Sequence, residues 1–170
     1  MGEYIKDLQI HLAVTDDTNR IIDMLKQVAQ WMKENSINQW RFLLEGGDDE
    51  EIEQAILNRN TYIVLKGYEL VGTFTLLHKQ SEWDRDIWGE DSVSNSLYLH
   101  RLALVPMCMK QGFGSKILNW IVKNTDSPIE YLKLDCVADN PKLNNFYKAN
   151  GFELIGVTDG HSKYQKSIKG

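Results

Sequence analysis

Two glycines, Gly112 and Gly114, are the first residues in this chain whose type and spacing could do chemistry. They follow an apolar run, residues 97–105, that has the composition of a buried strand. A helix that begins at these glycines leaves its first backbone N–H groups without partners inside the helix, and its dipole places about half a unit of positive charge there. The order of strand, loop and helix mouth therefore predicts a site that can hold a phosphate group.

Taken alone, the glycine loop (residues 109–115) is open to several interpretations. A dinucleotide-binding fingerprint requires a third glycine at position 117, where Ile117 stands. A P-loop requires four residues between its glycines, followed by Lys and Ser or Thr, and the loop lacks both features. The remaining interpretation is a tight turn that uses glycine for backbone freedom and binds nothing.

The C-terminal part of the chain distinguishes these interpretations. Asn140 precedes a helical segment that contains Phe146 and Tyr147, and the segment ends at Gly151 and Phe152. In order and spacing, this pattern resembles the GNAT superfamily of acetyl-CoA-dependent N-acetyltransferases. The upstream residues that match the same family are Leu102, Ala103, Leu104, Pro106, Gly112 and Gly114.

The resemblance implies that acetyl-CoA is the acetyl donor and that no metal is required. The pantetheine would lie along the strand Leu102, Ala103 and Leu104 like an added strand, because unpaired backbone groups there can bind its amides. Asn140 would cap its helix or bond the pantetheine. The residues implied to meet the pyrophosphate are Lys110, Gln111, Gly112, Phe113, Gly114 and Ser115. Met109 departs from the family, which usually has Arg or Gln at that position, and Lys110 could supply the missing charge.

The resemblance also assigns the acid of the reaction. Tyr147 aligns with the family's general acid, and a phenol stays protonated at neutral pH and can protonate a departing thiolate. The base is open. Asp135 matches a carboxylate that serves as base in one branch of the family, His100 is a second candidate, and a water chain to a distant carboxylate would need neither.

The acceptor is expected to be a primary amine of a small molecule or a peptide, with direct transfer in a ternary complex. Trp40, Trp83 and His100 are the predicted acceptor-binding residues. Trp83 and Trp88 stand in an acidic segment that would suit a cationic amine, although a solvated charged loop explains the same composition. The alternative function is a non-catalytic acyl-CoA sensor of the same fold.

Hydrophobic periodicity predicts the elements that must position these residues. We expect a single GNAT domain over residues 1–170, of the α/β (α+β) class. Its central sheet would be mixed, mostly antiparallel, of about seven strands, with helices on both faces. The expected strands are residues 8–14, 61–65, 70–77, 97–105, 131–137, 152–157 and 163–168. We expect four helices: the first ends near residue 34, the second begins within residues 48–51, and the other two span residues 112–124 and 141–149. Residues 78–96 are expected to form a long loop.

Composition sets the outer limits. The 170 residues are 42% hydrophobic and 25% charged, which predicts a globular protein. The net charge of -5 argues against nucleic acid as a partner, and no apolar run has the length of a membrane span. Cys108 and Cys136, without a recognisable export signal, predict reduced thiols and a cytoplasmic protein. A monomer or a homodimer fits equally well.

Overall fold

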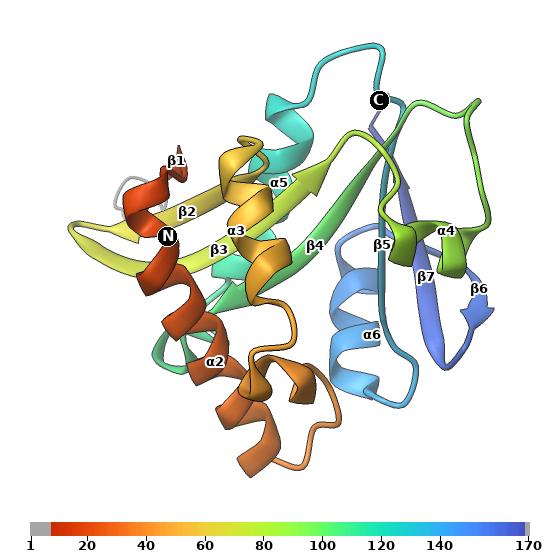
Figure 1. Ribbon diagram of the computed structural model, residues 1–170. Coiled ribbons are helices and arrows are strands. Elements are labelled where there is room, and N and C mark those ends of the chain that lie inside the picture. Colours follow the sequence, from red (N-terminus) through yellow and green to blue (C-terminus); the bar gives the residue numbers. More distant parts are fainter. Residues whose placement is uncertain (1–7, 169–170) are drawn as a thin grey trace. The chain divides into compact units, whose positions relative to one another are not determined.

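The computed structural model describes residues 8–168, which form five α-helices and seven strands (Figure 1). The helices are α2 (Thr18–Glu34), α3 (Asp49–Leu57), α4 (Glu82–Trp88), α5 (Phe113–Asn124) and α6 (Pro141–Ala149). The strands are β1 (Leu8–Leu12), β2 (Thr61–Lys66), β3 (Glu69–Leu77), β4 (Ser96–Leu104), β5 (Tyr131–Val137), β6 (Glu153–Thr158) and β7 (His161–Ser167). They are hydrogen-bonded in the order β1-β2-β3-β4-β5-β7-β6, which confirms the predicted sheet. The pairs β1–β2, β2–β3, β5–β7 and β6–β7 are antiparallel, and the pair β4–β5 is parallel.

The chain divides into two compact units, and β3, β4 and α5 each contribute to both. The first unit comprises residues up to 75 together with residues 101–116, and the second comprises residues 76–100 and 117–170. The single domain expected from the sequence stays a prediction.

In the first unit, α2 and α3 supply most of a continuous apolar core. Ile21, Leu25 and Val28 recur at helical spacing along α2 and are buried, because this spacing places them on one side of the helix. Ile52 of α3 and Ile63 of β2 belong to the same cluster. The same core includes Ala103 of β4, and Leu65 of β2 and Leu70 of β3 pack against it.

In the second unit, β5 has a different partner on each face. Because successive side chains of a strand point to opposite faces, Leu134 and Cys136 share one face, and Lys133 and Asp135 share the other. Tyr164 of β7 pairs with Leu134, so it lies on the first face, where it packs against the ring of a tyrosine of α6. Helix α4 contacts the second face through bonds described below.

The expectation that residues 78–96 form one long loop is wrong, because α4 lies within this segment. Ser81 accepts a hydrogen bond from the backbone of Asp84, and the Asp84 carboxylate accepts one from the backbone N–H of Ser81. This reciprocal capping box starts the helix, and burial of Ile87 holds it against the second unit. The sequence of this segment is polar and acidic because few residues of α4 are buried, so no apolar periodicity indicates the helix.

Two further observations concern the described part of the chain. Within residues 8–168, no helix has both the length and the apolar character of a membrane span. In the same range, no group of three or more His, Cys, Asp or Glu side chains is placed to hold a metal ion. Cys108 and Cys136 are both free and buried.

Candidate functional site

The glycine loop has the backbone geometry of an open helix mouth. Gly112 has a φ of 81° and Lys110 one of 65°, so the loop uses left-handed conformations that glycine adopts without strain. A Cβ at Gly112 would meet no atom within 4 Å, which leaves room beside its backbone. Phe113 is fully buried and anchors the first turn of α5. The loop therefore combines a fixed helix start with open space beside Gly112, and Gln111 braces it by donating to the Met107 carbonyl at 2.8 Å.

Met109, the residue that departs from the family pattern, has a structural explanation. It is partly buried and packs against the apolar core of the first unit. Lys110, the next residue, is exposed. The thioether therefore serves packing, and the cation nearest in sequence lies at the surface.

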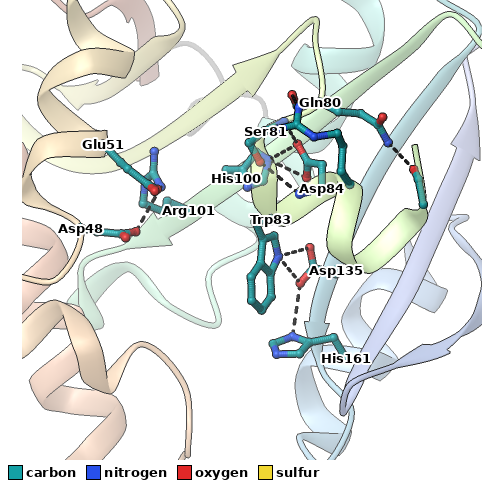
Figure 2. Close-up of polar contacts among 12 residues, drawn as sticks. Asp48, Glu51, Gln80, Ser81, Trp83, Asp84, His100, Arg101, Asp135 and His161 are labelled. Carbon is teal, nitrogen blue, oxygen red and sulfur yellow. Dashed lines mark hydrogen bonds and ion pairs between the residues drawn. The ribbon is translucent and has the colours of Figure 1, made fainter. Parts of the chain in front are cut away.

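The strand that leads to this loop is irregular. Arg101, in the middle of β4, has a φ of 50°, which interrupts extended geometry just before Leu102. Its guanidinium lies 3.2 Å from the Asp48 carboxylate, and both side chains are mostly buried (Figure 2). Ala103 is buried, and the Val105 N–H donates to the Val71 carbonyl of β3 at 2.9 Å. An ion pair and the β3 contact thus fix the conformation of this part of β4.

Trp40, predicted to bind the acceptor, lies in the first unit. It is partly buried and packs against the same apolar core as Met109. Its φ of 62° places it at a turn ahead of the short 3-10 helix Arg41–Glu45. The structure thus gives the indole a packing role, and its role in binding an acceptor stays a prediction.

On the α4 side of the second unit, Asp135 is held by two side chains from other elements (Figure 2). The Trp83 indole N–H donates to both carboxylate oxygens, with Nε1 3.1 Å from Oδ1 and 3.2 Å from Oδ2. His161 of β7 places Nδ1 3.2 Å from Oδ2. The rings of Trp83 and His161 meet edge to face, with centroids 4.9 Å apart. Asp135 is therefore a partly buried carboxylate fixed by α4 and β7.

His100 takes part in a second histidine–carboxylate pair. Its Nε2 lies 3.0 Å from the carboxylate of Asp84, which is only 1% exposed. Because Asp84 also caps α4, this pair ties the helix to β4. Anchoring α4 accounts for His100, and its contact with an acceptor stays a prediction.

Trp88 contacts cations that belong to the chain itself. Lys133 Nζ lies 4.9 Å from the centre of the indole ring, and Lys163 Nζ lies 5.7 Å from it. Lys133 is buried, which lowers the pKa of its ammonium, and Asp91, 3.9 Å away, opposes that shift. These two lysines occupy cation–π positions on Trp88, whereas Trp83 keeps 44% of its surface exposed.

Tyr147 lies on the opposite face of β5, in an aromatic cluster. Its ring centroid is 5.2 Å from that of Phe146, 5.7 Å from Phe152 and 5.8 Å from Tyr164. Burial raises the pKa of the Tyr147 phenol well above its ordinary value, and the Cys136 thiol and the Asp135 carboxylate act in the same direction. The phenol is therefore protonated at neutral pH.

The helix that carries Tyr147 is fixed at its start and along its length. Asn140 caps it, since its side-chain oxygen accepts from the Leu143 N–H at 3.2 Å. Asn144 is buried and accepts a hydrogen bond from the Tyr164 hydroxyl at 2.6 Å. The capping role predicted for Asn140 is confirmed, and its bond to a cofactor stays a prediction.

Sequence reasoning missed His161 and Asp84. The last strand was expected to begin at residue 163, which left His161 in a turn, and Asp84 lay in the supposed loop. Alternation extended back along β7 would have placed His161 on the face of Asp135, because Val137 and His161 are register partners. The spacing of Ser81 and Asp84 would have indicated the capping box.

Comparison with known proteins gives a consistent result. A family model described as the acetyltransferase (GNAT) family matches residues 25–152. The uncharacterized N-acetyltransferase YesJ of Bacillus subtilis (strain 168) is 36% identical over 158 residues, which cover 92% of this chain and 88% of that protein.

Solved structures agree. A GNAT-family acetyltransferase from Listeria monocytogenes 4b F2365 has a TM-score of 0.82 at 26% identity and covers 94% of each chain. The PaiA N-acetyltransferase from Thermoplasma acidophilum, solved in complex with coenzyme A, has a TM-score of 0.74 at 17% identity, covering 94% of this chain and 98% of that one.

Proposed function

The chain belongs to the GNAT family of acetyltransferases, and we propose that it transfers the acetyl group of acetyl-CoA directly to a primary amine of a small molecule or a peptide. The observation that carries this proposal is the arrangement around β5. A buried, protonated phenol, Tyr147, lies on one face, and a fixed carboxylate, Asp135, lies on the other. Acyl transfer to an amine needs a proton donor for sulfur and a proton acceptor for nitrogen.

The cofactor is proposed to bind along β4 and the glycine loop. Pairing with β5 joins Ser96–Tyr98 of β4 to Tyr131–Lys133, and Leu102, Ala103 and Leu104 lie farther along the strand. Their backbone groups would bond the pantetheine amides, and a backbone amide there would polarise the thioester carbonyl. The coenzyme A bound to the related Thermoplasma enzyme supports this choice of ligand.

The pyrophosphate would meet the amides of the glycine loop. The open space beside Gly112 supports this assignment, because a phosphate must approach the backbone closely. The residues proposed to contact it are Lys110, Gln111, Gly112, Phe113, Gly114 and Ser115.

In the reaction, the amine nitrogen attacks the thioester carbonyl, and Tyr147 protonates the sulfur as the C–S bond breaks. Burial keeps the phenol protonated until sulfur departs. Donation of its proton leaves a phenolate, which must take up a proton again before the next turnover. The proton of the amine passes to a base, for which Asp135 is the candidate predicted from the sequence. Trp83, which is partly exposed beside this carboxylate, is proposed to contact the acceptor, together with His100 and Trp40.

A panel of amines tests the function. Purified protein would be mixed with acetyl-CoA and with amino acids, peptides bearing free N-termini, diamines and amino sugars, and release of the coenzyme A thiol would be followed with a thiol-reactive dye. Calorimetry would measure acetyl-CoA binding in parallel, with Gly112→Val as a variant expected to lose it. We expect binding, together with amine-dependent thiol release for at least one class.

The alternative, an acyl-CoA sensor, is favoured by one observation, the apolar Met109 in the cofactor loop. Acetyl-CoA binding without thiol release across the whole panel would support the sensor and reject the transferase. Absence of binding by the wild-type protein would reject both.

A further inference from the structure

His161 and Asp135 form a pair whose geometry limits where a proton can reside. Nδ1 of the imidazole is buried and lies 3.2 Å from Oδ2 of the carboxylate. A lone pair on Nδ1 would face a negative charge at this distance, so the neutral imidazole carries its proton on Nδ1. The approach is bent and does not meet the geometry of a good hydrogen bond, so the attraction is mainly that of charge and dipole. The nitrogen left with a free lone pair is Nε2.

The two members of the pair differ in access. The His161 side chain keeps 24% of its surface exposed, whereas that of Asp135 keeps 11%. Because Nδ1 is itself buried, the exposed surface of His161 belongs to its other atoms. Both oxygens of Asp135 already accept a hydrogen bond from the Trp83 indole. The imidazole is therefore the more open of the two groups.

Trp83 holds both members of the pair in place. An indole N–H is a donor only and neither ionises nor accepts a proton at ordinary pH, so it holds the carboxylate without competing for the proton of the substrate. Its ring also meets the His161 ring edge to face. One side chain of α4 thus fixes both the carboxylate and the imidazole.

We propose that His161 Nε2 takes the proton from the acceptor amine, and that Asp135 and Trp83 are positioning residues that hold the imidazole in the required tautomer. This inference rests on the proposed function. Attack of the neutral amine forms the C–N bond and moves the carbonyl π electrons to oxygen. The surplus proton on nitrogen passes to His161 Nε2. When the carbonyl re-forms, the C–S bond breaks, and sulfur keeps the electron pair and takes the Tyr147 proton. Solvent then carries a proton from the imidazolium to the phenolate, so that one amine hydrogen ends on sulfur.

The groups that face His161 must be known before the effect of a charge-removing variant can be interpreted. Asp135 lies diagonally across on β5, and Lys163 lies on β7 on the same face, opposite Asp135 in the register. From α4 the contact is the neutral Trp83, and on β6 the register partner is the uncharged Thr158. Asp135→Asn therefore removes the negative charge of the pair while preserving its shape.

The kinetic test uses His161→Asn, because the asparagine amide nitrogen can replace Nδ1 toward Asp135 but supplies no base at the position of Nε2. We expect kcat to fall about 100-fold or more, within the range for loss of a general base, while KM for acetyl-CoA changes less than about threefold. The decline in kcat/KM at acidic pH should disappear from the profile of the variant. His11→Asn, an exposed histidine of β1, is the matched control and should behave as wild type.

A second measurement does not depend on activity. Long-range ¹H–¹⁵N NMR of the histidine rings reports which nitrogen carries the proton, and His161 is assigned from its loss in His161→Asn. We expect a protonated Nδ1 and an unprotonated Nε2 in neutral wild-type protein, with a shift toward the Nε2–H tautomer in Asp135→Asn.

The outcomes separate cleanly. An Nε2–H tautomer in the wild type overturns the inference whatever the activity. So does a His161→Asn enzyme that keeps its acidic limb or loses less than about threefold in kcat. A wild type that is inactive toward every amine rejects the proposed function instead, and the assignment of the base falls with it.

Discussion

Replacement of Tyr147 by Phe separates catalysis from structure, because only the hydroxyl is lost. The ring keeps its contacts with Phe146, Phe152 and Tyr164, so the stability should change by about 1 kcal/mol or less. Loss of a general acid typically slows a reaction about 10²- to 10⁴-fold. At about 1.4 kcal/mol for each factor of ten, the barrier rises by roughly 3–6 kcal/mol. The expected result is a large fall in kcat from an almost unperturbed fold.

The assay combines three measurements on the same preparation. Thiol release gives kcat, calorimetry gives the dissociation constant for acetyl-CoA, and urea unfolding gives the stability. We expect kcat to fall at least about 100-fold, while the dissociation constant stays within about threefold of wild type.

Tyr164→Phe is a matched control in the same aromatic cluster. Its hydroxyl donates to the Asn144 side chain at 2.6 Å, so its removal leaves a buried amide oxygen without that donor. We expect a loss of roughly 1–3 kcal/mol in stability and little change in kcat. A Tyr147→Phe enzyme that turns over within about threefold of wild type would refute the reasoning that makes this phenol the acid.

Three further substitutions probe the frame around the site. Gly72→Ala should destabilise the protein by about 1–3 kcal/mol in urea, because the new Cβ would lie 3.0 Å from the Ala103 carbonyl oxygen and 3.1 Å from a Leu104 methyl; unchanged stability would show that β4 is free to move. Met109→Arg should lower stability without tightening acetyl-CoA binding by more than about threefold, since Met109 packs against the core; a tenfold gain in calorimetry would assign this position to the ligand. Burial raises the pKa of the Cys136 thiol to about 12, so as pH rises above 9 the unfolded chain loses this proton first and the wild-type protein becomes less stable. Cys136→Ala lacks the thiol, so its stability relative to wild type should increase as pH rises from 9 toward 12. Urea midpoints of the two proteins that run parallel from pH 7 to 11 would contradict this.

Local patterns predicted most of the elements because burial imposed a clear period on them. The alternation of Tyr131–Val137 and the Asn140 cap followed by Pro141 appear in the structure at the expected residues. Helix α4 was missed because its stability comes from a capping box and from buried Asp84, not from an apolar stripe. Carboxylates are rarely buried, so a prediction from composition places Asp84 at the surface, whereas the structure buries it.

The candidate site likewise contains residues that local sequence predicts and residues that only long-range pairing of strands brings together. Asp135 and Tyr147 could be predicted as candidates from the sequence, because Tyr147 lies within the motif that begins at Asn140 and Asp135 lies five residues before it. His161 was not predicted, because its proximity to Asp135 depends on the register of β5 with β7 and on a side chain from α4. Register between strands that are distant in sequence is set by the packing of whole faces, and one residue of slip moves every side chain to the other face.

That register explains why β5 suits a reaction with two proton transfers. Adjacent residues of a strand point to opposite faces, so Asp135 turns toward α4 while Cys136 turns toward the aromatic cluster around Tyr147. The two groups therefore have different surroundings. A single strand between them keeps the phenol protonated in apolar surroundings and the carboxylate bonded to Trp83. In the proposed reaction, the proton removed from nitrogen and the proton delivered to sulfur would thus be handled by different groups on opposite faces of one strand.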